Sequence, residues 1–401
     1  MPKSTFFTGQ PVFSQLLSLI PPGLVRTLSY RYRSDRYCKT FKTHDHLVTM
    51  LYACLHRCSS LREVVTGMQA NYNKIGQLGL KRLPCRSTFA EANKRRDADF
   101  FEHLYHELYR YHYPFLPDSR GNKSIENRLF IMDSTTISLF TDIMKGAGCP
   151  AADGRKKGGA KAHVLLDAHN DIPALIRLSA ASRNDKILMG DINLPRGSIL
   201  VFDKGYHHFA QWQRWTDQRI NWVTRLIDHE VIEVISERTL TKEQLQSGVQ
   251  SDQVIILGRG TLKTTRRIQV RLVSYYDAVS KKTFRFLSNN FKFSPQTIAN
   301  IYKGRWQIEL FFKRFKQHNP VRLFLGDNEN AIKIQLWCSF IADLLIKIIK
   351  DRLRRPWSFA NLSSTIRHNL MNYLHLKTFL NNPDRLILNT TPDKPPDLFT
   401  Q

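Results

Sequence analysis

The sequence contains little cysteine for its length. Six cysteines occur in 401 residues, and without an export signal they are expected to be reduced thiols rather than a disulfide framework. Only Cys54 and Cys58 lie close together, and no second Cys or His pair at zinc-finger spacing follows them. We therefore expect a buried or incidental cysteine pair rather than a metal site.

Long apolar runs are also missing. The longest apolar stretch, Ile334–Ile349, is interrupted by Asp343 and Lys347 and is too short to cross a bilayer. The first residues, MPKSTFFTGQPVF, lack the charged start, apolar core and cleavage site of a secretory signal. The sequence thus predicts a cytoplasmic protein without a membrane partner.

Acidic residues are scarce relative to basic ones. The chain has 34 Asp and Glu against 60 Lys and Arg, a net charge of +26, which indicates a polyanionic partner, nucleic acid before any other. The regions 1–127, 128–293 and 294–401 contain 19, 25 and 16 basic residues against 10, 16 and 8 acidic ones. This even distribution favours a globular body lying along a nucleic-acid backbone. A generally basic soluble protein is the alternative.

Residues 1–125 are predicted to form a helical DNA-binding region. Apolar residues recur there at helical spacing. Two capping boxes indicate helix starts, Ser60 with Glu63 and Thr88 with Glu91, because each places a hydroxyl at the N-cap and a carboxylate three residues later.

The helix after Thr88 carries a basic cluster formed by Lys94, Arg95 and Arg96. A short basic helix after a basic turn is typical of the recognition helix of a helix-turn-helix, which makes these three residues candidates for DNA recognition. A solvated charged helix face explains the cluster equally well.

From residue 128 the pattern changes to a mixed α/β arrangement. Short apolar runs over 128–227 predict three strands in succession and then strands alternating with helices. Residues 228–293 are alternating or β-branched, which predicts a β-rich insertion. The α/β domain resumes over 294–350, and 351–401 is predicted to be a C-terminal helical region with a tail.

Two aspartates end or interrupt apolar strands in the same manner, Asp133 in FIMDSTT and Asp203 in LVFDKGY. An ionised carboxylate beside a buried run is costly unless it is paired, hydrogen-bonded or bound to a metal. Asp at the carboxyl end of a strand is also a common turn or helix-capping residue. Neither aspartate alone decides between a functional and a structural role.

A helix is predicted to start at Ser294 and to run to about His318. One face of this helix carries Tyr302, Arg305, Glu309 and Lys316. The opposite face, which should pack on the sheet, carries Ile301, Ile308, Phe311 and Phe315. A solvated face with one ion pair explains the charges, but it explains neither the phenol nor Gly304, which costs about 1 kcal/mol in a helix interior.

Two strand aspartates and one helical glutamate are what a two-metal phosphoryl-transfer site requires. Carboxylate oxygens would hold two Mg²⁺ ions, one activating the attacking hydroxyl and the other stabilising the leaving oxygen. Basic and phenolic groups on the face of Glu309 would bind the phosphates beside the scissile bond. Asp133, Asp203 and Glu309 are therefore the candidate metal ligands and catalytic residues.

This pattern resembles the DDE transposases of bacterial insertion sequences, in the cut-and-paste group whose signature is tyrosine, two residues, arginine, three residues, glutamate, six residues and lysine. The signature is matched in full by Tyr302, Arg305, Glu309 and Lys316. Asp133 and Asp203 stand in the family's contexts for the first two acids. The resemblance covers roughly residues 30–350.

The resemblance implies a ribonuclease H-like catalytic core interrupted by the β-rich insertion. The three acids would hold two Mg²⁺ or Mn²⁺ ions, and Tyr302, Arg305 and Lys316 would contact phosphates of the transposon end. It further implies hydrolytic nicking, a DNA hairpin intermediate and strand transfer. The partners would be double-stranded transposon ends and target DNA, bound by a homodimer that has no small-molecule substrate.

In some relatives of that family an aromatic residue of the insertion stacks on a flipped base. The equivalent residue here would be Phe284, Phe286 or neither. Core packing is the other interpretation for both rings.

Two other functions compete with the transposase. A haloacid-type phosphatase would use Asp133 as its nucleophile, but it wants an acid two residues later, where the chain has Thr135. The other is a non-catalytic DNA-binding protein descended from a transposase.

Overall fold

The computed structural model describes residues 9–21, 23–115, 128–138, 159–181, 185–258, 260–261, 264–265, 267–319, 321 and 323–386. Contacts within the chain divide it into two compact units, residues 1–116 with 316–401 and residues 117–315. The predicted C-terminal tail, residues 389–401, lies outside the described residues. Within the described ranges, no helix combines the length and the apolar character needed to span a membrane.

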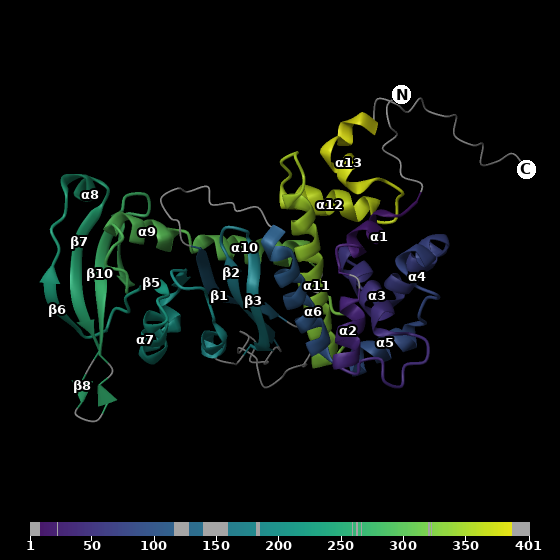
Figure 1. Ribbon diagram of the computed structural model, residues 1–401, viewed down its shortest axis with the longest axis horizontal. Coiled ribbons are helices and arrows are strands. Elements are labelled where there is room, and N and C mark those ends of the chain that lie inside the picture. Colours follow the sequence, from purple (N-terminus) through teal and green to yellow (C-terminus); the bar gives the residue numbers. More distant parts are fainter. Residues whose placement is uncertain are drawn as a thin grey trace, which may run out of the picture. The chain divides into compact units, whose positions relative to one another are not determined.

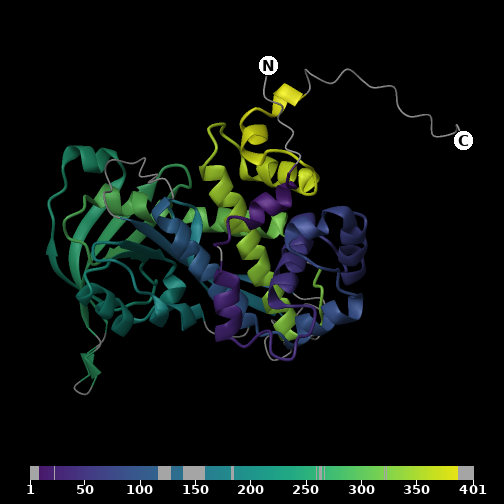
Figure 2. The same ribbon diagram turned by 45° about the vertical axis from the view of Figure 1, so that its right-hand side comes forward.

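The first unit is built from helices (Figure 1). They are α1 (Val12–Leu17), α2 (Leu24–Arg31), α3 (Thr43–His56), α4 (Leu61–Gln69), α5 (Arg86–Arg95), α6 (Ala98–His112), α11 (Glu329–Asp351), α12 (Phe359–Asn369) and α13 (Leu376–Asn381). The longest of them, α11, packs against both α3 and α6 (Figure 2). Most residues of α3 and α11 are buried, as expected for helices that other helices surround.

The helix start predicted at Ser60 is confirmed, although the Glu63 carboxylate accepts from the Ser59 N–H and not from that of Ser60. The capping box predicted at Thr88 is wrong. At the start of α4 the Ser60 hydroxyl accepts a hydrogen bond from the Glu63 N–H at 3.2 Å. Helix α5 instead begins at Arg86, with Cys85 in an extended conformation at the N-cap position. Thr88 lies inside the first turn, where its hydroxyl is 3.0 Å from the Cys85 sulfur.

The second unit is built on a nine-stranded sheet with the order β3-β2-β1-β4-β5-β11-β10-β7-β6. Its strands are β1 (Leu129–Ser138), β2 (Gly159–Asp167), β3 (Ile172–Ala180), β4 (Ile199–Phe202), β5 (Asn221–Arg225), β6 (Ile232–Glu237), β7 (Val249–Leu257), β10 (Ile268–Asp277) and β11 (Lys282–Ser288). Strands β1, β2 and β3 pair antiparallel, whereas β4 pairs parallel with both β1 and β5. The predicted mixed α/β fold is thereby confirmed.

The β-rich segment 228–293 extends the same sheet. Strand β11 pairs antiparallel with β5, and β10, β7 and β6 follow. The short strands β8 (Gly260–Thr261) and β9 (Thr264–Thr265) form a separate ribbon that projects beyond the ends of β7 and β10 (Figures 1 and 2). Pairing with β5 satisfies backbone groups that would otherwise be left open at a sheet edge.

Helices cover the two faces of this sheet. On one face, α7 (Phe209–Asp217) buries Trp212 and Trp215 in a cluster that includes Phe202. On the other face, α9 (Pro295–Lys303) packs in a cluster that includes Val201. Val201 and Phe202 belong to different clusters because successive residues of a strand point to opposite faces.

The helix predicted over 294–318 is interrupted. It forms two helices, α9 and α10 (Trp306–His318), separated by Gly304 and Arg305. A Cβ at Gly304 would lie 3.1 Å from the carbonyl oxygen of Ile301. The absence of a side chain therefore favours the close approach of the backbone between α9 and α10. Gly304 thus marks a helix end and not a costly position inside a helix.

The division between the two units differs from the predicted domain boundaries. The sequence assigned 294–350 to the α/β core, whereas residues from 316 onward group with the helical unit. The reason is α11, whose apolar residues pack against α3 and α6.

Candidate active site

Asp133 and Asp203 occupy equivalent positions on neighbouring parallel strands. The register between β1 and β4 pairs Met132 with Phe202, so the next residue along each strand is an aspartate. Adjacent strands lie about 4.8 Å apart. The two carboxylates therefore stand side by side where β4 ends, at the edge of the sheet where α/β proteins commonly bind ligands.

Both aspartates point to the face of the sheet that α9 covers. Leu129 and Val201, which lie an even number of residues before them, pack in the α9 cluster, and residues two apart on a strand share a face. The side chains of Asp133 and Asp203 are 22% and 33% exposed. Each carboxylate is thus largely removed from water but still accessible.

The two helices carry the other predicted residues to these aspartates. The Tyr302 hydroxyl, from α9, donates to Asp203 Oδ1 at 3.3 Å. Arg305 donates from Nη1 to Asp133 Oδ2 at 3.0 Å and from Nη2 to Glu309 Oε1 at 2.5 Å. These contacts form two hydrogen-bonded groups within the second unit, Tyr302 with Asp203 and Arg305 with Asp133 and Glu309. The two groups adjoin, because the guanidinium carbon of Arg305 lies 5.9 Å from the centre of the Tyr302 ring.

Arg305 neutralises two of the acids at once. Burial opposes its charge, but the phenol of Tyr302 and the carboxylates of Glu309 and Asp133 outweigh burial and raise its pKa. Carboxylates this close repel one another when no cation lies between them. Arg305 therefore holds Asp133 and Glu309 together.

Arg225 is a site residue that the sequence analysis missed. Strand β5 pairs Val223 with Val201 of β4, so Arg225 and Asp203 lie at the same level on adjacent strands. Arg225 Nη2 donates to Asp203 Oδ1 at 3.3 Å, and its guanidinium carbon lies 5.7 Å from the Tyr302 ring centre. A cation at the end of the next parallel strand was the available signal.

The pKa values of the two aspartates are shifted in opposite directions. Burial raises the pKa of Asp133 to about 6, although a backbone N–H and Arg305 oppose it. Burial also acts to raise the pKa of Asp203, but a backbone N–H, Arg225 and Arg305 outweigh it and the pKa is lowered. The two carboxyl groups thus differ in their affinity for a proton.

The donor atoms suit a divalent cation, although the described residues contain no set of three or more His, Cys, Asp or Glu side chains arranged to hold one. Carboxylate oxygens are the ligands that Mg²⁺ and Mn²⁺ prefer. Arg305 supplies the positive charge between Asp133 and Glu309. If the guanidinium exchanges these partners for others, Asp133, Asp203 and Glu309 are the residues that would hold a metal.

Lys316 lies in the last turn of α10, on the same side of the helix as Glu309. The division between the two compact units falls between Phe315 and Lys316, so its role in phosphate binding stays a prediction. The residues predicted for the opposite face are confirmed as buried: Ile301, Ile308, Phe311 and Phe315.

The structure divides the basic cluster at the end of α5. Lys94 and Arg95 are exposed, and Arg95 pairs with Glu91 one turn earlier. Arg96 is only 6% exposed, and its guanidinium donates to the carbonyl oxygen of Phe41. Because Arg96 is used to anchor the chain at Phe41, only Lys94 and Arg95 remain as surface candidates for DNA recognition.

Phe286 lies in the core of the second unit. Its ring centre is 4.9 Å from that of Tyr302, and Phe284 stacks on Phe286 with ring centres 6.1 Å apart. Phe286 supports the Tyr302 ring, which is the packing role considered for it from the sequence. Phe284 is half-buried.

The sequence family described as the transposase DDE domain matches residues 125–345, more than half of the chain. The chain belongs to this family. The transposase also matches, over residues 8–81, a domain of unknown function (DUF4372). Membership makes it a DNA transposase, an enzyme that cleaves and transfers DNA strands.

Two proteins similar in sequence to this transposase are also named as transposases. A Sinorhizobium fredii protein named as a transposase is 31% identical over 267 residues, 66% of this chain and 71% of that protein. A Geobacillus stearothermophilus protein, named as a transposase for insertion sequence element IS5377, is 29% identical over 57% of this chain and 58% of its own. A solved piggyBac transposase synaptic complex with hairpin DNA gives a TM-score of 0.41 at 12% identity, over 98% of this chain and 85% of that one.

Proposed function

We propose that this transposase binds the ends of the insertion sequence that encodes it, and excises and integrates that element through Asp133, Asp203 and Glu309. One observation carries the proposal. Asp133 and Asp203 directly follow the paired residues Met132 and Phe202 of two parallel strands. Arg305 links Asp133 to the helical Glu309. Such a set of half-buried carboxylates suits phosphoryl transfer.

We further propose that the first five strands form a ribonuclease H-like core. The order β3-β2-β1-β4-β5, with β2 antiparallel and β4 and β5 parallel to β1, supports this assignment. The strands of 228–293 would then be an insertion that lengthens the sheet beyond β5. The site lies in the core part, where β4 ends beside the middle of β1.

The mechanism we propose uses two Mg²⁺ or Mn²⁺ ions per site. When bound, they supply activation of the attacking hydroxyl and stabilisation of the leaving oxygen. The chain's own residues would orient the DNA and neutralise the charge of its phosphates. Burial raises the pKa of Tyr302 to about 12, so its phenol stays a hydrogen-bond donor. Arg305 and Lys316, with Tyr302, would bind the phosphates beside the scissile bond.

The reaction proposed for the DNA is hydrolytic nicking, hairpin formation and strand transfer of the double-stranded ends into target DNA. A homodimer would hold the two ends together. This part of the proposal is supported by the match of Tyr302, Arg305, Glu309 and Lys316 to the signature of the cut-and-paste transposases. The net charge of +26 is consistent with contacts to several DNA segments.

The test is incubation of a supercoiled plasmid that carries the DNA flanking the gene, with purified protein and Mg²⁺. We expect Asp133→Asn, Asp203→Asn and Glu309→Gln each to lose cleavage by several orders of magnitude while still retarding the DNA in a gel. Asp217→Asn and Glu243→Gln remove exposed acids of the same unit and should cut normally. A Glu309→Gln protein that cuts at the parental rate would refute the assignment. A wild-type protein that binds but leaves the plasmid uncut would favour a non-catalytic DNA-binding protein.

A further inference from the structure

The segment 23–44 of the helical unit presents a concentrated positive charge. It contains six Lys and Arg against one Asp, and four of its arginines are exposed: Arg26, Arg31, Arg33 and Arg36. Within the part of the chain that the structure describes, none of these four forms an ion pair with an acid. Unpaired arginines close together repel one another, so their proximity favours an anionic ligand.

Two tyrosines stand among these arginines with their rings in solvent. Tyr30 is 88% exposed and Tyr37 is 87% exposed. The guanidinium carbon of Arg36 lies 4.8 Å from the centre of the Tyr37 ring. Exposed aromatic rings beside arginines are typical of surfaces on which nucleic-acid bases stack.

The turn that carries Tyr37 is strained and firmly held. Arg33 and Tyr37 have φ angles of 47° and 61°, in the left-handed region that bulky residues rarely adopt. The Asp35 carboxylate fixes the turn by accepting hydrogen bonds from the N–H and hydroxyl of Thr43 at 2.6 and 2.7 Å. Strain of this kind persists where surrounding structure imposes it, commonly at binding sites.

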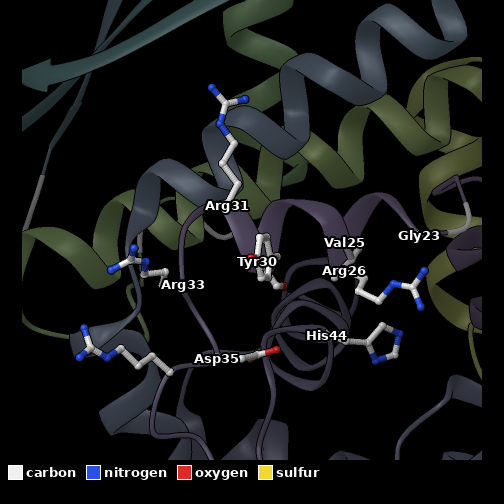
Figure 3. Close-up of a pocket in the computed structure, with 10 residues that line it drawn as sticks. Gly23, Val25, Arg26, Tyr30, Arg31, Arg33, Asp35 and His44 are labelled. Carbon is white, nitrogen blue, oxygen red and sulfur yellow. The ribbon is translucent and has the colours of Figure 1, made fainter.

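The surface is hollowed in two places. One hollow of about 850 Å³ is lined by α2 and the turn after it, and Figure 3 shows Arg26, Arg31 and Arg33 extending from it in different directions around Tyr30. A second hollow of about 750 Å³ shares Arg33 and Arg36 with the first and also includes Tyr37 and Arg95. The two hollows adjoin, because Arg33 and Arg36 line both, and together they make up one strip of the surface.

We propose that this strip, the arginine–tyrosine surface formed by residues 23–44, binds DNA at unpaired bases. The arginines would contact phosphates, and Tyr30 and Tyr37 would stack on bases whose faces are free. A regular duplex hides those faces because its own bases stack on one another. Binding of a duplex would therefore depend on charge alone, and the two exposed rings would add little to the affinity. The inference rests on the proposed DNA transposition and adds a second DNA site, distinct from the site of Asp133, Asp203 and Glu309.

Arg96 has a positioning role in this site. Its guanidinium donates to the Phe41 carbonyl and, at 3.5 Å, to the Cys38 sulfur, and thereby fixes the chain just after Tyr37. Of the basic cluster predicted at the end of α5, Arg96 thus supports the arginine–tyrosine surface from beneath, while Arg95 lines its rim.

The test measures binding of the full chain, in EDTA, to fluorescein-labelled oligo(dT) of about 15 nucleotides and to a duplex of about 25 base pairs. Replacing Tyr30 or Tyr37 by leucine should weaken oligo(dT) binding about tenfold each and change duplex binding less than twofold. Tyr72→Leu, which removes another exposed ring of the same unit (77% exposed), is the matched control and should change neither. Unfolding curves check that each variant is folded.

Salt dependence tests the arginines independently. Each of Arg31→Gln, Arg33→Gln and Arg36→Gln should lower the slope of log K against log salt for oligo(dT) by about 0.7, whereas Arg354→Gln, an exposed arginine of the same unit, should not. Tyrosine variants that behave as Tyr72→Leu does, or that weaken both probes equally, overturn the proposal. Since no cleavage occurs in EDTA, such a failure would be distinct from a plasmid left uncut in Mg²⁺.

Discussion

Asp133→Asn should stabilise the metal-free protein above pH 6 and leave its stability unchanged near pH 4. The pKa of Asp133 is raised from 3.8 to about 6 by burial, so the folded state binds this proton more tightly than the unfolded state. Between about pH 4 and 6 the folded state alone carries the proton, and the free energy of unfolding falls as pH rises through this window. Asparagine carries no charge and abolishes the fall.

The magnitude follows from the size of the pKa difference. Each unit of pKa corresponds to about 1.4 kcal/mol, so a difference of about 2 corresponds to ~3 kcal/mol at most. The amide loses the charge-assisted hydrogen bond with Arg305, which offsets part of the gain, and we expect a net stabilisation of about 1–2 kcal/mol at pH 8. For a unit of this size the melting temperature should rise by about 2–8 °C.

The assay is thermal unfolding followed by circular dichroism, in EDTA, across this pH range. Asp203→Asn is the matched comparison, because the pKa of Asp203 is lowered by a backbone N–H, Arg225 and Arg305 against the effect of burial. Its ionised form stabilises the fold above the unfolded pKa, and this stabilisation is lost as pH falls through the folded pKa. At pH 8 the two substitutions should therefore shift the melting temperature in opposite directions. If both lower it, Asp133 is a stabilising ion and the reasoning is wrong.

Three other substitutions test parts of the structure, each by one measurement. Arg225→Met should lower the melting temperature by the equivalent of about 1 kcal/mol or less, since the ion pair is partly exposed, and should reduce plasmid cleavage because Asp203 loses its partner; unchanged cleavage would make Arg225 structural only. Ser60→Ala should cost about 1 kcal/mol of unfolding free energy through the lost N-cap, measured by urea titration, with cleavage unaffected. Glu309→Gln should still be able to bind transposon-end DNA in a gel in Ca²⁺, and loss of that binding would show that the substitution disturbs more than the acid.

The sequence predicted the aspartate pair because its signal is local and chemical. Asp133 and Asp203 each follow an apolar run, and an ionised carboxylate in that position costs free energy unless it has a hydrogen-bond, ion-pair or metal partner. The strand register then places them as neighbours. Ser60 was predicted for the same reason, since a cap depends only on residues within one turn of it.

The sequence did not predict the features that depend on how distant segments of the chain pack together. The break at Gly304 was predicted as a helix interior because the apolar spacing continues across it. Arg225 carries no motif, and its role appears only when β5 is known to pair with β4. The grouping of α11 with the helical unit could not be read from its apolar pattern, which suits burial against a sheet or against other helices equally well.

Arg96 shows how the sequence around a residue can mislead a prediction of its role. Its sequence context, beside Lys94 and Arg95, is that of a charged helix face, and nothing local distinguishes it from them. In the fold it is buried, because the helix ends there and the guanidinium reaches the carbonyl of Phe41. A buried arginine needs acceptors, and the chain after Tyr37 supplies them. The charge that the sequence assigned to DNA contact thus holds in place the chain just after the exposed Tyr37.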